Sequence, residues 1–220
     1  MRVNLLSILY PNCCPGCGEI ISSDKKFCND CKAELSFIKV KQYKNKDNRF
    51  NSLISVFYYK DTAKRMISRY KFYGKKNIHK IMSEYMIREF EENYSSIDFD
   101  YITYVPMSAT EYKERGFNQT KLLAKDISRK TKIKCRKLLK KTRKTKHQMS
   151  LKAKERATNL KDCFKPTEEI KGKKVLLVDD IKTTGTTLNE CSKALRQAGA
   201  REIYCITFAI ADDNQINLKE

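Results

Sequence analysis

The sequence has no apolar stretch close to the roughly 20 residues that cross a lipid bilayer, which argues against membrane insertion. The short apolar segment after Arg2 stops at Pro11 with no small-residue cleavage site, unlike a signal peptide. The chain also lacks Trp, but its 10 Phe and 12 Tyr provide enough bulk for a core. We therefore expect a folded, cytoplasmic protein.

Acidic residues are far fewer than basic residues, and most of the resulting net charge lies in one segment. The chain carries 46 Lys and Arg against 26 Asp and Glu, a net charge of +20. Residues 129–161 hold 15 basic side chains and one acid, Glu155, and so account for 14 of the 20 net charges. This charge favours an anionic partner such as nucleic acid or a phosphorylated small molecule. A solvated basic surface loop is the simpler alternative.

Four of the nine cysteines form two C-x-x-C pairs, Cys14 with Cys17 and Cys28 with Cys31. An odd number of cysteines and this paired spacing fit a metal site better than a disulfide framework. Four thiolates favour tetrahedral zinc and leave no open position, so the spacing predicts a structural zinc site. Free thiols are the alternative, and Cys13 could replace Cys14 as a ligand.

The remaining sequence indicates an α/β domain. We divide the chain into a small four-cysteine zinc-binding module at 1–38, a polar connector at 39–51 and a larger domain at 52–220. Apolar and β-prone runs predict strands, and apolar residues spaced by three and four predict helices. The strands are expected at 52–59, 98–106, 174–180 and 201–210, and the helices at 77–93, 116–130 and 187–199. This order predicts βαβ units with a parallel sheet.

The segment from 175 to 188 carries most of the chemistry. An apolar strand brings Asp179 and Asp180 to its carboxyl end, where ligands of open α/β sheets bind. The following helix opens with Thr183, Thr184, Gly185, Thr186 and Thr187, whose hydroxyls and amides suit a phosphate. Since paired carboxylates beside a phosphate need sugar hydroxyls or a cation, the pattern predicts a site for a phosphorylated ribose. No P-loop or dinucleotide fingerprint competes with this interpretation.

This segment resembles the 5-phosphoribosyl-1-pyrophosphate (PRPP) motif of type I phosphoribosyltransferases. With the cysteine pairs ahead of it, the chain is similar to the ComF family of competence proteins. The resemblance extends to Arg-Gly-Phe-Asn-Gln at 115–119, and to Thr-x-x-Gln at 145–148 followed by Arg-x-x-Asn at 156–159. Together these motifs cover nearly the whole chain.

The resemblance implies a site for PRPP with magnesium, with the ribose on Asp179 and Asp180 and the 5-phosphate on residues 183–187. Pyrophosphate contacts are implied for Pro106, Met107, Ser108 and Arg115, with Asn118 and Gln119 as further candidates for this pocket. A flexible basic loop within 141–163 is implied to close over the site, through Lys141, Arg143, Lys144, Lys146, Gln148 and Arg156.

Two functions remain open at this point. One is phosphoribosyl transfer, which works by positioning and charge stabilisation and so leaves no catalytic residue to assign. The other is a competence factor that binds single-stranded DNA, in which PRPP is an effector. The resemblance implies DNA uptake in natural transformation, with the DNA-uptake helicase machinery as a further partner. The acceptor of a transfer reaction cannot be read from the sequence.

Overall fold

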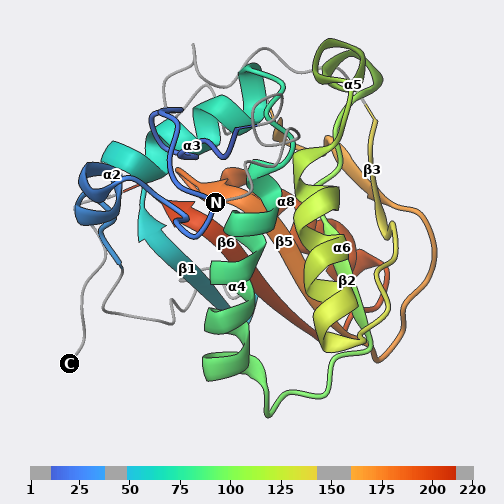
Figure 1. Ribbon diagram of the computed structural model, residues 1–220. Coiled ribbons are helices and arrows are strands. Elements are labelled where there is room, and N and C mark those ends of the chain that lie inside the picture. Colours follow the sequence, from blue (N-terminus) through green and yellow to red (C-terminus); the bar gives the residue numbers. More distant parts are fainter. Residues whose placement is uncertain (1–10, 38–48, 143–159, 212–220) are drawn as a thin grey trace.

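The computed structural model describes residues 11–37, 49–142 and 160–211 (Figure 1). The strands expected at 52–59, 98–106, 174–180 and 201–210 appear as β1, β2, β5 and β6, and helices lie between them. The elements are α2 (Asn29–Ala33), β1 (Ser52–Tyr58), α3 (Asp61–Phe72), α4 (Ile78–Tyr94), β2 (Tyr101–Tyr104), α5 (Ala109–Arg115), α6 (Gln119–Thr131), β3 (Leu139–Lys141), β4 (Phe164–Pro166), β5 (Lys174–Lys182), α8 (Thr186–Gln197) and β6 (Glu202–Ile210).

A four-stranded sheet forms the centre of the structure, with strand order β1-β6-β5-β2 and every neighbouring pair parallel. The apolar run of β5 lies between β6 and β2, as expected for a strand buried on both faces. Parallel strands place their carboxyl ends at one edge of the sheet, so the ends of β2 and β5 lie together. The predicted parallel α/β architecture is confirmed.

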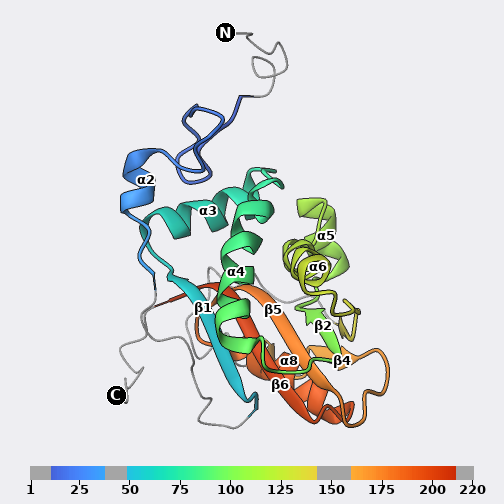
Figure 2. The same cartoon turned by 60° about the horizontal axis from the view of Figure 1, so that its bottom comes forward.

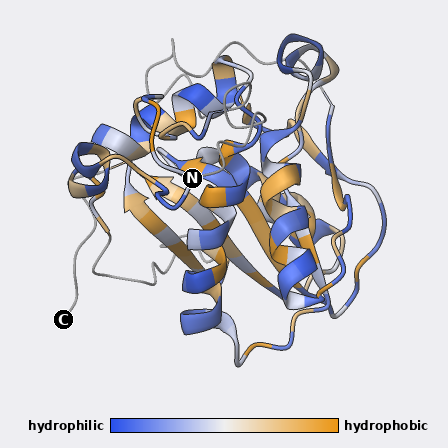
Figure 3. Ribbon diagram, in the orientation of Figure 1, coloured by the Kyte–Doolittle hydropathy of each residue, from blue (hydrophilic) through white to orange (hydrophobic). Residues whose placement is uncertain are grey.

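Helices cover both faces of this sheet, and each face has its own apolar core. Leu176 and Val178 of β5 pack into the core beneath α4 and α6, whereas Val175 and Leu177 pack into the core beneath α8. This division follows from the alternation of side chains along a strand. Figure 2 shows the sheet between these layers, and Figure 3 shows that its strands are mainly hydrophobic.

Three of the described helices were not expected from the sequence. α2 lies in the cysteine-bearing segment, with Cys28 as its N-cap. α3 lies between β1 and α4, and α5 follows the loop after β2. α5 starts with a capping box, in which Ser108 and Glu111 satisfy each other's backbone amides, and it ends at Gly116 with φ 72°. The helix expected at 116–130 therefore begins later, at Gln119, with Asn118 as its N-cap.

The cysteine-bearing segment packs against the larger domain. Cys14, Phe27 and Cys31 belong to the same buried core as residues of α3 and α4. The ring of Phe37 packs against that of Phe57 of β1 in a tilted arrangement, with 4.5 Å between ring centroids. Most of the connector proposed at 39–51 lies outside the described residues. Among the helices that the structure describes, none combines the length and apolar character needed to cross a membrane.

Candidate functional site

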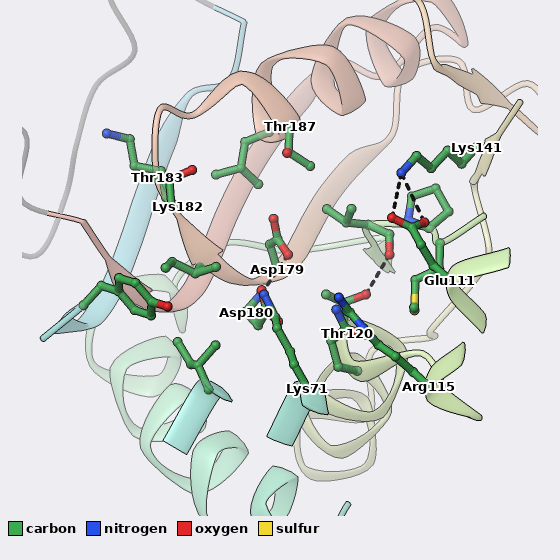
Figure 4. A pocket seen from close by; sticks show the side chains of 18 of the residues that line it. Lys71, Glu111, Arg115, Thr120, Lys141, Asp179, Asp180, Lys182, Thr183 and Thr187 are labelled. Carbon is green, nitrogen blue, oxygen red and sulfur yellow. Dashed lines mark hydrogen bonds and ion pairs between the residues drawn. The ribbon is translucent and has the colours of Figure 1, made fainter. Parts of the chain in front are cut away.

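A cavity of about 390 Å³ opens at the carboxyl ends of β2 and β5. Its volume falls in the range of small-molecule sites. α3 and the end of β1 form one wall, α5 and the start of α6 form a second, and the turn into α8 forms a third (Figure 4). The lining residues are Tyr59, Lys64, Ile67, Ser68, Lys71, Phe72, Val105, Pro106, Met107, Glu111, Arg115, Gln119, Thr120, Lys141, Phe164, Asp179, Asp180, Ile181, Lys182, Thr183, Gly185, Thr187 and Leu188.

Asp179 and Asp180 lie at the bottom of this cavity. β5 continues past the apolar run and pairs with β6 as far as Lys182, so the two acids belong to the strand itself. Asp179 is 7% exposed and Asp180 is 2% exposed. Burial, with a smaller contribution from the Asp180 carboxylate, raises the pKa of Asp179 to about 8. Asp179 is therefore largely protonated at neutral pH.

The cation that balances this charge comes from α3. Lys71 Nζ lies 2.8 Å from Asp180 Oδ2, and only 16% of the Lys71 side chain is exposed. Figure 4 shows Lys71 extending from its helix toward the diacid. The Lys71 ammonium also lowers the pKa of Asp179 and so opposes the effect of burial. The Lys71 ammonium thus lies beside the carboxylates at the place where a ligand would contact them.

The Thr-Gly turn has the geometry of an anion site. Gly185 is the N-cap of α8 and has φ 77°, a conformation that glycine adopts without strain. Gly185 has no side chain to cap this helix, and the Thr186 amide makes a long contact of 3.5 Å to the Thr184 hydroxyl oxygen. Further amides of the first turn have no partner within the helix. Thr183, Gly185 and Thr187 line the cavity, whereas Thr184 and Thr186 share a hydrogen bond of 2.9 Å between their hydroxyls.

Gln119, at the start of α6, has an unused polar atom at the cavity. The residue is 7% exposed, and its Oε1 has no hydrogen-bond partner within the described part of the chain. The neighbouring Thr120 is different, since its hydroxyl donates to the carbonyl oxygen of Val105 at 2.6 Å. A buried acceptor without a partner is costly, so Gln119 suits a ligand hydroxyl.

A second buried ion pair lies on the α5 side of the cavity. Lys141 Nζ is 3.0 Å from Glu111 Oε1, and only 4% of the Lys141 side chain is exposed. Although burial opposes ionisation, the amide of Ser108 and the Lys141 ammonium lower the pKa of Glu111. Lys141 ends β3, and the antiparallel pairing of β3 with β4 helps to hold it in place. The site therefore contains a fixed cation before any ligand binds.

The structure brings together only part of the set of residues predicted to bind the ligand. Pro106, Met107 and Arg115 line the cavity, whereas Ser108 and Asn118 cap α5 and α6. Five residues predicted for the basic loop lie outside the described residues: Arg143, Lys144, Lys146, Gln148 and Arg156. Sequence reasoning missed Lys71, Phe72 and Glu111. The Ser-x-x-Glu capping pattern could have revealed α5 and hence Glu111.

The four cysteines of the C-x-x-C pairs form one cluster, in which all Sγ atoms lie within 4.8 Å of one another. A tetrahedral zinc with Zn–S bonds of about 2.3 Å requires sulfur atoms about 3.8 Å apart. The sulfurs of Cys17 and Cys28 are 3.7 Å apart. Cys14 belongs to the cluster and is buried, whereas Cys13 is exposed and its thiol lies 3.5 Å from the carbonyl oxygen of Pro11.

The surroundings of the cluster also fit a structural zinc. The amide of Cys31 points to Cys28 Sγ at 3.5 Å, and Arg65 Nη2 lies 3.4 Å from Cys31 Sγ. At Gly16 a Cβ atom would lie 2.8 Å from Cys31 Sγ, so only glycine fits there. These donors stabilise thiolates, and four thiolates fill the coordination of a structural zinc.

A parallel sheet with a diacid and a Thr-Gly turn at the end of β5 defines a type I phosphoribosyltransferase fold, here preceded by a four-cysteine zinc ribbon. A family model for the phosphoribosyl transferase domain matches residues 121–219, and one for the double zinc ribbon domain matches residues 5–42. Competence protein F of Haemophilus influenzae is 30% identical over 211 residues, which cover 90% of each chain. The chain belongs to the ComF family of competence proteins.

Other relatives carry related names. Competence protein ComFC of Streptococcus pneumoniae is 30% identical over 190 residues, 86% of this chain and 77% of that protein. DNA utilization protein YhgH of Escherichia coli K12 is 28% identical over 203 residues, 88% of each chain. The structure of adenine phosphoribosyltransferase from Saccharomyces cerevisiae is 17% identical to this chain. The match covers 81% of this chain and 86% of that protein, with a TM-score of 0.41.

Proposed function

We propose that the cavity at the end of β5 binds PRPP together with magnesium. The observation that carries this proposal is that the diacid and the Thr-Gly turn line the same cavity. Asp180 at the end of β5 and Gly185 of the turn are only five residues apart. Carboxylates accept hydrogen bonds from sugar hydroxyls, while the start of α8 offers amides to a phosphate. A ribose 5-phosphate carries both groups on one small molecule.

The remaining lining residues suit the other parts of PRPP. Arg115 and Lys141 present cations on the α5 side, next to Pro106 and Met107, where pyrophosphate would bind. The free Oε1 of Gln119 would accept a hydrogen bond from a ribose hydroxyl. Without ligand, Glu111 forms an ion pair with Lys141, and bound pyrophosphate would compete with Glu111 for the same ammonium group.

Magnesium fits this donor set, because it prefers carboxylate and phosphate oxygens and is usually held through few protein ligands. Asp179 and Asp180 would hold it jointly with oxygens of PRPP, and it would supply charge neutralisation at the pyrophosphate. In a transfer reaction, an acceptor atom forms a bond to C1 of the ribose with its lone pair. The bond from C1 to the pyrophosphate oxygen breaks, and pyrophosphate leaves with that electron pair. Arg115 and Lys141 would stabilise the charge of the leaving group.

We further propose that the protein serves DNA uptake in the cytoplasm of a naturally transformable cell. This part of the proposal is supported by its relatives, whose names refer to competence and to DNA utilization. PRPP would then act either as a substrate or as an effector of DNA handling.

Calorimetric titration of magnesium-PRPP into the wild-type protein tests the pocket. We expect saturable binding that is lost in the Asp179→Asn/Asp180→Asn double variant, because both carboxylates are replaced by neutral amides of the same shape. Asp100→Asn is a matched control, since this acid pairs with Lys173 and the amide of Lys174 at the opposite end of β5. The control should bind like the wild type. Equal binding by the double variant would refute the proposed ribose site.

A further inference from the structure

Exposed aromatic side chains gather beside the pocket. Five large apolar side chains are exposed in the described part of the chain, and three of them are Phe72, Tyr73 and Tyr112. Tyr73 is 70% exposed and Tyr112 is 53% exposed. Isolated exposed apolar residues are ordinary, but a group of aromatic rings at one place on the surface indicates a binding surface.

These rings lie on two segments, residues 72–76 after α3 and residues 112–117 at the end of α5, which we call the aromatic rim. The guanidinium of Arg115 lies 5.2 Å from the ring centroid of Phe72, and Lys76 Nζ lies 5.3 Å from that of Phe117. Both views of the fold place the end of α3 and α5 on the same side of the molecule (Figures 1 and 2). The aromatic rim is therefore one surface built from two parts of the chain.

The charge of the aromatic rim is positive. It contains Lys75, Lys76, Lys113 and Arg115 against one acid, Glu114. The three lysines are exposed, and Arg115 is half-buried because it packs on Phe72. Cations beside exposed rings attract phosphates and suit the stacking of bases, a combination that binds single-stranded nucleic acid. An apolar protein partner would not require this excess of cations.

The rings themselves are available for stacking. Among the described residues, no aromatic or cationic group packs on the ring of Tyr73 or Tyr112. Phe72 and Arg115 also line the cavity, so the aromatic rim is continuous with the proposed PRPP site. A strand bound along the rim would thus pass the mouth of the pocket.

We propose that the aromatic rim binds single-stranded DNA, with bases stacked on Tyr73 and Tyr112 and phosphates on the neighbouring lysines. The choice of DNA over RNA rests on the proposed function, whereas the stacking and the charge are properties of the surface itself.

Fluorescence anisotropy with a labelled oligo(dT) of about 16 nucleotides provides the first test, since this length fills one site of the usual size. We expect the affinities of Tyr73→Ala and Tyr112→Ala each to fall by at least about fivefold, the lower limit for loss of one stacked base. Ile20→Ala is the matched control, because Ile20 is also 70% exposed but lies in the cysteine module. Unchanged affinity in both tyrosine variants would overturn the proposal.

The lack of Trp in the chain allows a direct probe of stacking. In Tyr73→Trp the new indole is the sole Trp, and its emission should be quenched by oligo(dT) but not by an abasic strand of the same length. Equal quenching by both strands would show that bases do not stack there. Tighter binding of oligo(rU) than of oligo(dT) would overturn the assignment to DNA.

Salt dependence and PRPP binding complete the test. The Lys75→Ala/Lys76→Ala variant should reduce the slope of log affinity against log salt by about 1.4, or about 0.7 for each lost phosphate contact. An unchanged slope would remove these lysines from the site. Tyr73→Ala should still bind magnesium-PRPP, because Tyr73 does not line the cavity. Loss of DNA binding with intact PRPP binding would thus support the aromatic rim as a site distinct from the pocket. Intact DNA binding with loss of PRPP binding would contradict the role of Tyr73 in the aromatic rim.

Discussion

Lys71→Met tests whether the buried Lys71–Asp180 pair stabilises the fold and keeps the diacid charged. The Lys71 ammonium and the Asp180 carboxylate are 2.8 Å apart, with 16% and 3% of their side chains exposed. Removing one partner of such a pair costs about 3–5 kcal/mol, since the other charge is left buried alone. Asp180 can avoid this cost by taking up a proton. At pH 7 that uptake costs about 4 kcal/mol, or about 1.4 kcal/mol for each pH unit above 3.9.

The sign of the pH dependence follows from the same argument. In the variant, the pKa of Asp180 in the folded state rises above its unfolded value, so the folded state loses stability as the pH rises above about 4. We expect the free energy of unfolding to fall by about 4 kcal/mol at pH 7 but by only about 1.5 kcal/mol at pH 5. Urea unfolding followed by circular dichroism measures both values.

Two further variants make this result interpretable. Lys64→Met changes another lysine of α3 that lines the cavity but is exposed, and it should alter stability by less than about 0.5 kcal/mol. Lys71→Met/Asp180→Asn should recover most of the loss, because no buried charge is left without a partner. A loss in Lys71→Met below about 0.5 kcal/mol at pH 7, or an equal loss at pH 5, would refute the reasoning.

Three other predictions concern the two sites. Because the pKa of Asp179 is about 8, binding of magnesium-PRPP to the ionised diacid should release a proton, so affinity should rise about tenfold from pH 6.5 to 7.5. Asp179→Asn should remove that slope, which calorimetry in two buffers can measure. Purified protein should hold about one zinc, and a chelator should expose residues 11–37 to proteolysis; a metal-free protein of equal protease resistance would contradict the four-cysteine site. Glu111→Gln should release Lys141 and raise its reactivity toward acetylating reagents, whereas unchanged protection would show that other contacts bury it.

The sequence predicted the centre of the fold better than the walls of the site. β5 and α8 have strong local signals, namely an unbroken apolar run and a Thr-Gly turn before an amphipathic helix. α3 was not predicted, because the Lys and Arg residues among its 12 residues obscure the apolar pattern. Ala63, Met66, Ile67 and Tyr70 are nevertheless buried at helical spacing, so this spacing could have predicted the helix.

The position of Lys71 could not have been predicted in the same way. Lys71 and Asp180 are 109 residues apart and meet only because α3 packs over the end of the sheet. The same holds for the pair of Lys141 with Glu111, which joins a hairpin strand to a short helix. Periodicity shows which side chains are buried, but not which charges from distant elements come together.

α3 connects the cysteine cluster with the proposed ligand pocket. One part of the helix supports the cysteine cluster, through Arg65 at Cys31 and Arg69 against Gly18. Lys71, six residues or about 9 Å beyond Arg65, contacts the diacid. If zinc and PRPP bind as proposed, loss of zinc or oxidation of its thiolates should loosen the support of a helix that ends at the proposed pocket. Linkage is reciprocal, so a ligand that fixes Lys71 should also increase retention of the metal.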